Sequence, residues 1–124
     1  MNYKINVTRS FSSAHALREY KGKCENMHGH NWKVEVIVTG EKLDDGGILM
    51  DFGEIKKHVA GIMSMLDHKY LNELEFFQHS QPSSENIACF VAGQLQQRID
   101  NPSVRISRVT AWESDDASAT YIVE

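Results

Sequence analysis

Residues 31–43, NWKVEVIVTGEKL, decide the fold because apolar and polar side chains alternate along them. The apolar positions on one side are Trp32, Val34, Val36 and Val38. A period of two is the pattern of a β-strand with one buried face. Residues 3–14, YKINVTRSFSSA, show the same alternation, so the sequence predicts that two strands come first.

Helices are expected after a turn cluster, DDGG, at residues 44–47. Beyond the turn, apolar residues recur at steps of three and four, which predicts a helix with one apolar stripe. That stripe consists of Phe52, Ile55, Val59, Ile62, Met63 and Leu66. A second helix is predicted in SSENIACFVAGQLQQRI, residues 83–99, with Ser84 as its cap and Asn-Pro at 101–102 ending it.

Two further strands, residues 104–114 and 118–124, complete the order β-β-α-α-β-β in a single domain of residues 1–124. Without alternating β-α units, this order predicts an α+β fold: a four-stranded antiparallel sheet with two helices on one face. The other face would be uncovered, and strands rich in Val and Trp would expose apolar surface and long edges to water. We therefore expect the chain to self-associate.

The composition excludes several classes of partner. The 124 residues include 13 Lys plus Arg and 17 Asp plus Glu, a net charge of −4. No basic block that could follow a phosphate backbone is present, so a nucleic-acid partner is not expected. No apolar run suits a membrane span or a signal sequence. With only two cysteines, the sequence predicts a cytoplasmic protein with reduced thiols.

Residues 24–32, CENMHGHNW, contain two histidines separated by one glycine. In an extended segment, His28 and His30 point to the same side. If the first two strands pair antiparallel, the end of the first strand lies beside the start of the second, which brings His15 to this pair. Neutral imidazoles suit zinc, so the sequence predicts a zinc site made of His15, His28 and His30.

The chemistry of such a site depends on the fourth ligand. Three histidines with a vacant position would make the zinc catalytic, whereas Cys24 as a fourth protein ligand would make it structural. Lys21 and Lys23 precede Cys24, and a positive setting favours the reactive thiolate. The residues alone leave both interpretations open.

Asp67 and His68 follow the first predicted helix in LDHKYLN. A carboxylate beside an imidazole can orient the ring for proton transfer. A histidine at a helix C-terminus is also favoured by the helix macrodipole, so the pair by itself does not establish catalysis. No role is assigned to His58 or His79, and Cys89 is expected to be a packing residue.

Taken together, six segments resemble the 6-pyruvoyl-tetrahydropterin synthase family. In chain order they are FSSAH, CENMHGHNW, GILMDFGEIK, LDHKYLN, PSSENIA and AWES. The resemblance runs from about residue 3 to residue 123. Within the family, the sequence is similar to the queuosine-pathway branch, which forms 6-carboxy-tetrahydropterin. The gap between Cys24 and His28 is shorter than is usual in the pyruvoyl-forming branch, which favours the carboxy product. Ser83 and Ser84 stand where the family commonly has Thr.

The resemblance implies the tunnelling fold (T-fold), in which subunits trimerise into a β-barrel ringed by helices and two trimers commonly stack into a hexamer. Active sites then lie at subunit interfaces. It also implies three groups of site residues. Zinc is held by His15, His28 and His30; catalysis uses Cys24, Asp67 and His68; the pterin is bound by Glu113, Ser83, Ser84 and Glu85.

The implied reaction converts 7,8-dihydroneopterin triphosphate to 6-carboxy-5,6,7,8-tetrahydropterin, with release of acetaldehyde and triphosphate. Arg9, Lys21 and Lys23 are candidates for binding the triphosphate, and only their charge and their position in the sequence support this choice. Two alternatives are a 6-pyruvoyl-tetrahydropterin synthase, which keeps the three-carbon side chain, and a non-catalytic pterin-binding protein with a structural zinc.

Overall fold

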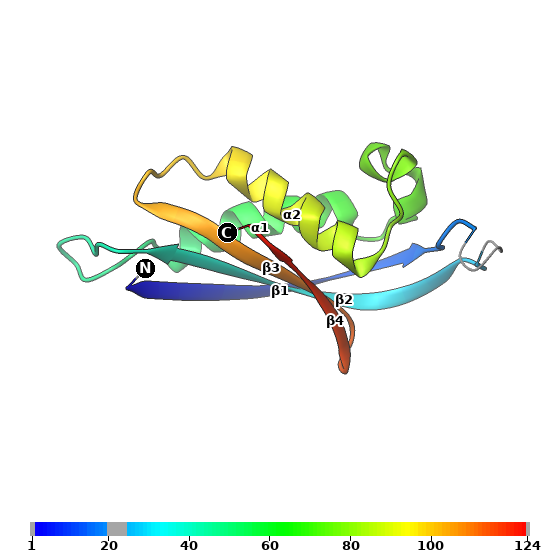
Figure 1. Ribbon diagram of the computed structural model, residues 1–124, viewed down its shortest axis with the longest axis horizontal. Coiled ribbons are helices and arrows are strands. Elements are labelled where there is room, and N and C mark those ends of the chain that lie inside the picture. The colour runs from blue at the N-terminus through cyan, green and yellow to red at the C-terminus, as the bar shows by residue number, and fades with distance from the viewer. Residues whose placement is uncertain (1, 20–24, 124) are drawn as a thin grey trace.

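The computed structural model describes residues 2–19 and 25–123, and the predicted order of elements is confirmed within them. The strands are β1 (Tyr3–His15), β2 (His28–Gly40), β3 (Val104–Ser114) and β4 (Ala117–Ile122). The helices are α1 (Phe52–Leu66) and α2 (Ser84–Arg98), separated by two short 3-10 helices, η1 (Leu71–Glu73) and η2 (Glu75–Gln78). Figure 1 shows both α-helices on one face of a single sheet.

The sheet has the order β1-β2-β3-β4, and every neighbouring pair is antiparallel. Strand β2 begins at His28, three residues before the predicted start, because its pairing with β1 continues to the last pair, His15 with His28. The alternation of apolar residues does not extend this far, so it could not reveal the true start. The long first hairpin therefore carries all three histidines to one end of the sheet.

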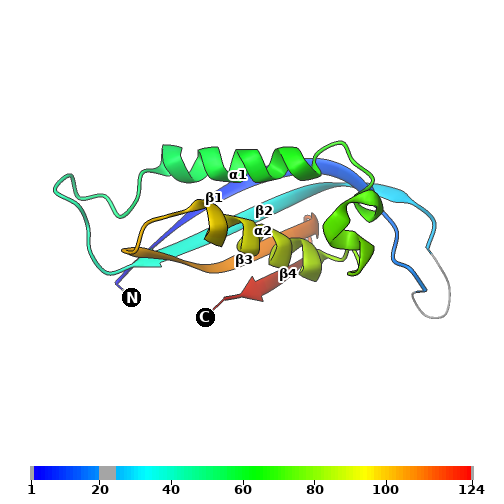
Figure 2. The ribbon, with the colours of Figure 1, turned by 90° about the horizontal axis from the view of Figure 1, so that it is seen from above.

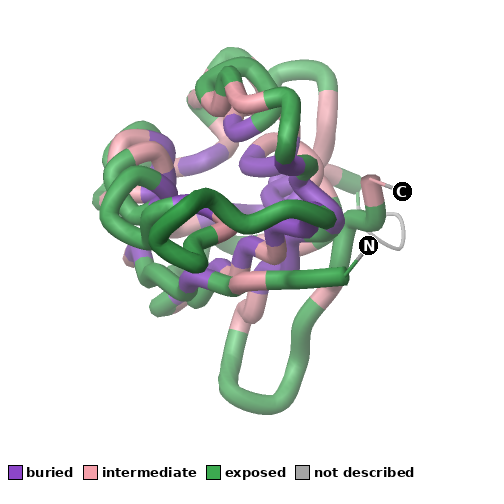
Figure 3. The backbone as a smooth tube through the Cα atoms, turned by 90° about the vertical axis from the view of Figure 1, so that its left-hand side faces the viewer, coloured by how far each residue is buried: buried purple, intermediate pink, exposed green. Residues whose placement is uncertain are grey.

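The core lies between the sheet and the helices, where the buried residues concentrate (Figure 3). Helix α1 packs over β1, and α2 packs over β3 and β4 (Figure 2). The predicted inward residues of α1 are buried, except that Phe52 is 52% exposed because it stands in the first turn. Among the described residues, no helix is long and apolar enough to cross a membrane.

The uncovered face of the sheet carries both polar and apolar side chains. Lys33 Nζ lies 4.8 Å from the centre of the Trp112 ring on this face. Ile37 and Ile122 pair with Arg108 in the register, and Ile122 is 63% exposed. Within the described residues, no strand pairs with the outer edges of β1 and β4, so these edges and the apolar part of the face both favour self-association.

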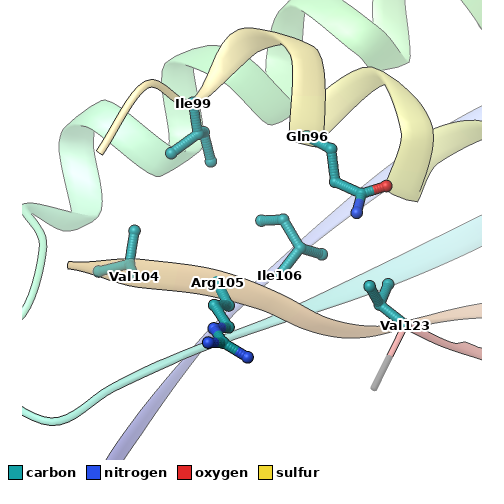
Figure 4. Close-up of a pocket in the computed structure, with 6 residues that line it drawn as sticks. All are labelled: Gln96, Ile99, Val104, Arg105, Ile106 and Val123. Atoms are coloured by element: carbon teal, nitrogen blue, oxygen red, sulfur yellow. The ribbon is translucent and has the colours of Figure 1, made fainter. Parts of the chain in front are cut away.

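A hollow of about 380 Å³ lies between the end of α2 and strand β3 (Figure 4). It is lined by Gln96, Ile99, Val104, Arg105, Ile106 and Val123. Most of this lining is aliphatic, and it includes none of the site residues expected from the sequence. The candidate site lies elsewhere, at the opposite end of β3.

Candidate metal centre and active site

Three imidazoles meet where β1 ends and β2 begins. The register places His15 opposite His28 and Ser13 opposite His30. The ring centroids are 4.6 Å apart for His15 and His28, 4.9 Å for His28 and His30, and 5.2 Å for His15 and His30. The antiparallel hairpin thus gathers the three predicted metal ligands.

Backbone carbonyl groups orient two of these rings. His15 Nδ1 lies 2.7 Å from the carbonyl oxygen of Pro82, and His28 Nδ1 lies 2.9 Å from that of Asn26. Because a carbonyl oxygen only accepts, each Nδ1 carries the proton, and in a neutral ring each Nε2 keeps a lone pair. Such outer contacts are typical of metal-binding histidines, and neither carbonyl was expected from the sequence.

Glu113 adds a fourth group to the cluster. Its Oε1 atom lies 3.2 Å from Nε2 of His15 and 3.2 Å from Nε2 of His30. One ligand atom from each of Glu113, His15, His28 and His30 lies within 4.8 Å of the others. The resemblance implied only a pterin-binding role for Glu113, although the alternation of β3 puts its side chain on the same face as Val109 and Ala111.

The donor set fits a metal ion. Nε2 of His15 and Nε2 of His30 are buried and have no hydrogen-bond partner among the described residues. Both nitrogens lie 3.2 Å from Glu113 Oε1, but neither makes a hydrogen bond with it. Buried polar atoms are rarely left without partners, and imidazole nitrogens with a carboxylate oxygen are zinc ligands. A divalent cation such as zinc would satisfy all of them.

Trp32 forms the floor of the cluster. It is fully buried, and its ring centroid lies 5.1 Å from that of His15 and 5.4 Å from that of His30, edge-on in both cases. The indole thereby keeps water from beneath the histidines and limits their rotation. The sequence pattern identified Trp32 only as a core residue, because alternation says nothing about its neighbours.

The electrostatic setting keeps His30 in its metal-binding form. Burial lowers the pKa of His30 below its ordinary value, and the nearby rings of His15 and His28 lower it further, against the opposing effect of Glu113. A lowered pKa means that the ring is neutral at physiological pH. Neutral imidazole is the form that coordinates zinc.

Helix α2 begins beside the histidines because Pro82, the acceptor for His15, directly precedes its cap. The cap is Ser83 rather than Ser84, which corrects the sequence prediction: Ser83 Oγ accepts a hydrogen bond from the backbone N–H of Asn86 at 3.2 Å. Ser83 has the extended backbone that a cap requires, whereas Ser84 already belongs to the first turn. Ser84 is therefore available for another role.

Replacing each serine by alanine should separate these roles. Ser83→Ala should lower the free energy of unfolding by about 1 kcal/mol, because the Asn86 N–H loses its acceptor. Ser84→Ala should change it by less than about 0.5 kcal/mol. Urea unfolding of the two variants measures the difference, and equal losses would contradict the assignment of the cap.

Asp67 and His68 lie along the outer edge of β1. The Asp67 carboxylate accepts a hydrogen bond from the backbone N–H of Ser12 at 2.8 Å and lies 2.9 Å from Nδ1 of His68. Two backbone hydrogen bonds hold residues 68–69 along this edge: the His68 N–H donates to the Ser12 carbonyl, and the Ala14 N–H donates to the Lys69 carbonyl. The expected carboxylate–imidazole pair is therefore formed.

His68 occupies a backbone conformation that normally selects glycine. Its φ is 55°, in the left-handed region, and it directly follows the cap of α1, where glycine is common. A β-carbon in this region costs about 1–2 kcal/mol. Since the side chain is 82% exposed, it gains little from packing. The combination of a strained backbone and an exposed imidazole paired with Asp67 favours the proton-transfer interpretation.

The structure does not bring this pair to the metal cluster of the same chain. Both groups lie near the end of β1 at His15, but Asp67 and His68 lie along the outer edge of this strand, whereas the cluster is formed on the other side, with β2 and β3. For residues 2–19 and 25–123, no hydrogen bond, ion pair or ring contact joins the two groups.

The pH dependence of stability should report the Asp67 contacts. The Ser12 N–H, followed by His68, holds the pKa of Asp67 below its ordinary value. A depressed pKa stabilises the fold above the unfolded value of about 3.9, and this contribution is lost as the pH falls through the lower folded value. Asp67→Asn should therefore be less stable than the wild type at pH 7, and the gap should narrow as the pH falls below about 4. Urea unfolding at pH 7 and at successively lower pH values measures it; a gap that widens in acid would refute this account.

Other expected site residues are less informative. Cys24, Lys21 and Lys23 lie outside the described residues. Glu25, which follows Cys24, is hydrogen-bonded to Leu17 twice: its backbone N–H donates to the Leu17 carbonyl, and its carboxylate accepts from the Leu17 N–H. Arg9 is exposed on β1, six residues before His15 and so about 20 Å away along the strand. Arg9 therefore does not adjoin the cluster of its own chain.

Comparison with known proteins relates the whole chain to one family. The description that matches residues 4–124 is 6-pyruvoyl tetrahydropterin synthase. A solved structure of the Caenorhabditis elegans 6-pyruvoyl tetrahydropterin synthase is similar, with a TM-score of 0.87, 30% identity, and coverage of 98% of this chain and 96% of that one. The agreement in fold extends over essentially the entire length.

Two sequence relatives differ in the activity that their names state. A protein of Archaeoglobus fulgidus, provisionally named a 6-carboxy-5,6,7,8-tetrahydropterin synthase, is 37% identical over 112 residues, covering 90% of this chain and 89% of the relative. A protein of Pyrococcus furiosus named a dihydroneopterin monophosphate aldolase is 33% identical over 116 residues, covering 94% of both. Both names concern pterins, but one states a synthase and the other an aldolase.

Proposed function

This chain belongs to the 6-pyruvoyl tetrahydropterin synthase family, and we propose that it is the zinc-dependent lyase that forms 6-carboxy-5,6,7,8-tetrahydropterin. The substrates would be 7,8-dihydroneopterin triphosphate and water, and the other products acetaldehyde and triphosphate. The observation that carries the proposal is the convergence of His15, His28 and His30 with two buried, unpartnered nitrogens. The short Cys24–His28 spacing favours the carboxy product. We place the reaction in the cytoplasm, in queuosine biosynthesis.

In this proposal His15, His28 and His30 hold zinc, which as a Lewis acid would acidify substrate hydroxyls and stabilise developing negative charge. The carbonyls of Pro82 and Asn26 keep two of the rings in the tautomer that presents Nε2. Trp32 excludes water from beneath the rings. No external reductant is required, since the side chain is oxidised while the pterin ring is reduced.

The remaining groups move protons and bind the pterin. Cys24 would act as base or nucleophile, and His68, oriented by Asp67, would exchange a proton with the other side of the substrate. The Glu113 carboxylate can accept two parallel hydrogen bonds from the ring N–H and the exocyclic amine of a pterin. Ser84 and Glu85, in the first turn of α2, would line the same pocket.

Assembly would complete the site. The part of the β1 edge before Ser12 and the edge of β4 would allow subunits to pair edge to edge into a barrel, with the uncovered face of the sheet turned inward. Asp67 and His68 flank the β1 edge, so an edge-to-edge neighbour can meet them. We propose a trimer, or a dimer of trimers, in which one subunit supplies the metal cluster and another supplies Asp67 and His68.

Product analysis tests this function directly. The zinc-loaded protein should release acetaldehyde and triphosphate from dihydroneopterin triphosphate and leave a one-carbon carboxyl group on the pterin. A 6-pyruvoyl-tetrahydropterin synthase would release triphosphate and keep the three-carbon side chain. Mass analysis of the pterin separates the two, and no acetaldehyde from the loaded protein would refute the proposal.

The Pyrococcus furiosus relative supports a second candidate, cleavage of a dihydroneopterin phosphate by a retro-aldol reaction. Such a cleavage leaves a hydroxymethyl group on the pterin and releases a two-carbon phosphorylated aldehyde. Offering the monophosphate and the triphosphate in parallel separates the candidates, because only the aldolase yields an aldehyde that retains phosphate.

A non-catalytic zinc protein makes a different prediction for Cys24. If its sulfur is the fourth ligand, Cys24→Ala should weaken zinc retention sharply. If the site is catalytic, the variant should lose turnover while the three histidines keep the metal. Zinc content after exhaustive dialysis decides between them.

A further inference from the structure

Glu113 is held less firmly than the other members of the cluster. The last residue pair between β3 and β2 is Trp112 with Lys33, one position before Glu113. Strand β4 skips Glu113 as well, because the register shifts between Trp112 and Ser114. Bulges of this kind commonly re-aim a side chain next to an active site. The side chain of Glu113 is 36% exposed, so a ligand from solvent can reach its carboxylate.

The present position of this carboxylate is that of a ligand. Zinc binds imidazole nitrogen and carboxylate oxygen at about 2.0–2.2 Å in a tetrahedron, whose ligand atoms are then about 3.3–3.5 Å apart. Glu113 Oε1 lies 3.2 Å from Nε2 of both His15 and His30, close to that edge length. No other hydrogen bond or ion pair to Glu113 occurs in the described part of the chain.

The tautomer of His15 strengthens this assignment. Its Nδ1 proton faces the Pro82 carbonyl, so a neutral ring presents the Nε2 lone pair toward the carboxylate oxygen. Two lone pairs 3.2 Å apart repel each other unless a cation lies between them. No hydrogen bond joins these atoms, so a metal ion held by both groups would account for the contact.

The Glu113 carboxylate therefore has two potential partners, the metal ion and the pterin. We infer that it switches between them. While the pterin site is empty, Glu113 is the fourth ligand of the metal. When the ring N–H and exocyclic amine of a pterin bind the carboxylate, it leaves the metal and frees a coordination position for the substrate side chain. This inference rests on the proposed function. It means that the metal becomes accessible to the substrate side chain only after a pterin ring has bound to Glu113.

Cobalt(II) in place of zinc tests the switch, because its visible spectrum reports the ligand set. The probe is 6-methyl-7,8-dihydropterin, which has the ring donors but no side-chain hydroxyl or phosphate. In the wild type, the probe should change the cobalt spectrum as it binds. Glu113→Ala should start with a spectrum distinct from that of the free wild type and show no change at saturating probe. It should also bind cobalt and zinc at least about tenfold more weakly.

The control is Glu41→Ala, which removes an exposed carboxylate from the loop after β2 and should behave as the wild type. A Glu113→Ala protein with wild-type metal affinity and spectrum would overturn the inference. So would a probe that binds the wild type, by calorimetry, without changing the cobalt spectrum, or that changes the Glu113→Ala spectrum equally. Acetaldehyde release is measured separately on the zinc form, so a failure of the proposed function is distinguishable from a failure of the switch.

Discussion

His30→Ala should release the metal and abolish turnover while the protein stays folded. His30 is the best of the three histidines for this test, because in the described part of the chain its ring donates no hydrogen bond to a backbone carbonyl, whereas His15 donates to Pro82 and His28 to Asn26. Removing a direct ligand should cost more than the roughly 10–100-fold in affinity that loss of an outer contact costs. Zinc content after dialysis against a weak chelator measures the loss.

Thermal unfolding gives an independent measure of the same loss. A ligand that binds only the folded state at 100 times its dissociation constant stabilises that state by about 2.7 kcal/mol. Added zinc should therefore raise the melting temperature of the wild type and leave that of His30→Ala nearly unchanged. His79→Ala, which removes an exposed histidine distant in sequence from the cluster, should respond to zinc as the wild type does. Full zinc retention by His30→Ala would refute the assigned metal centre.

His68→Gly should stop catalysis without harming the fold. Glycine adopts a φ of 55° without strain, so the variant should be as stable as the wild type or about 1 kcal/mol more stable. Loss of a general acid or base should lower kcat by about 10²–10⁴-fold. Zinc content should not change, because His68 does not contact the cluster within its own chain. A stable, zinc-loaded and fully active His68→Gly protein would remove His68 from the mechanism.

Mixing variants tests whether two subunits share the site. His30→Ala and His68→Gly should each be inactive, but a co-expressed mixture assembles sites that combine an intact cluster from one chain with an intact pair from another. If incorporation is random, roughly a quarter of the sites are complete. Recovered activity of that order supports the shared site. No recovery from mixed oligomers, verified by differently tagged chains, would contradict it.

Much of the fold followed from periodicity. The alternation from Trp32 to Val38 and the stripe from Ile55 to Leu66 each determine one buried face, because side-chain direction along a strand or helix is a local property. The histidine cluster was also accessible, since an antiparallel hairpin necessarily brings the end of β1 to the start of β2.

The roles of Pro82, Asn26, Trp32 and Glu113 required the structure. Which carbonyl fixes a ring tautomer, and which carboxylate meets two imidazoles, depend on atoms brought together from segments far apart in the chain. The left-handed backbone of His68 likewise results from running residues 67–70 along the edge of β1. By itself, the sequence determined which faces are buried and which ligands share a strand end, since both follow from local periods. The orientation of those ligands and the position of Asp67 and His68 along the outer edge of β1 required the tertiary structure, because both depend on long-range packing and hydrogen bonding.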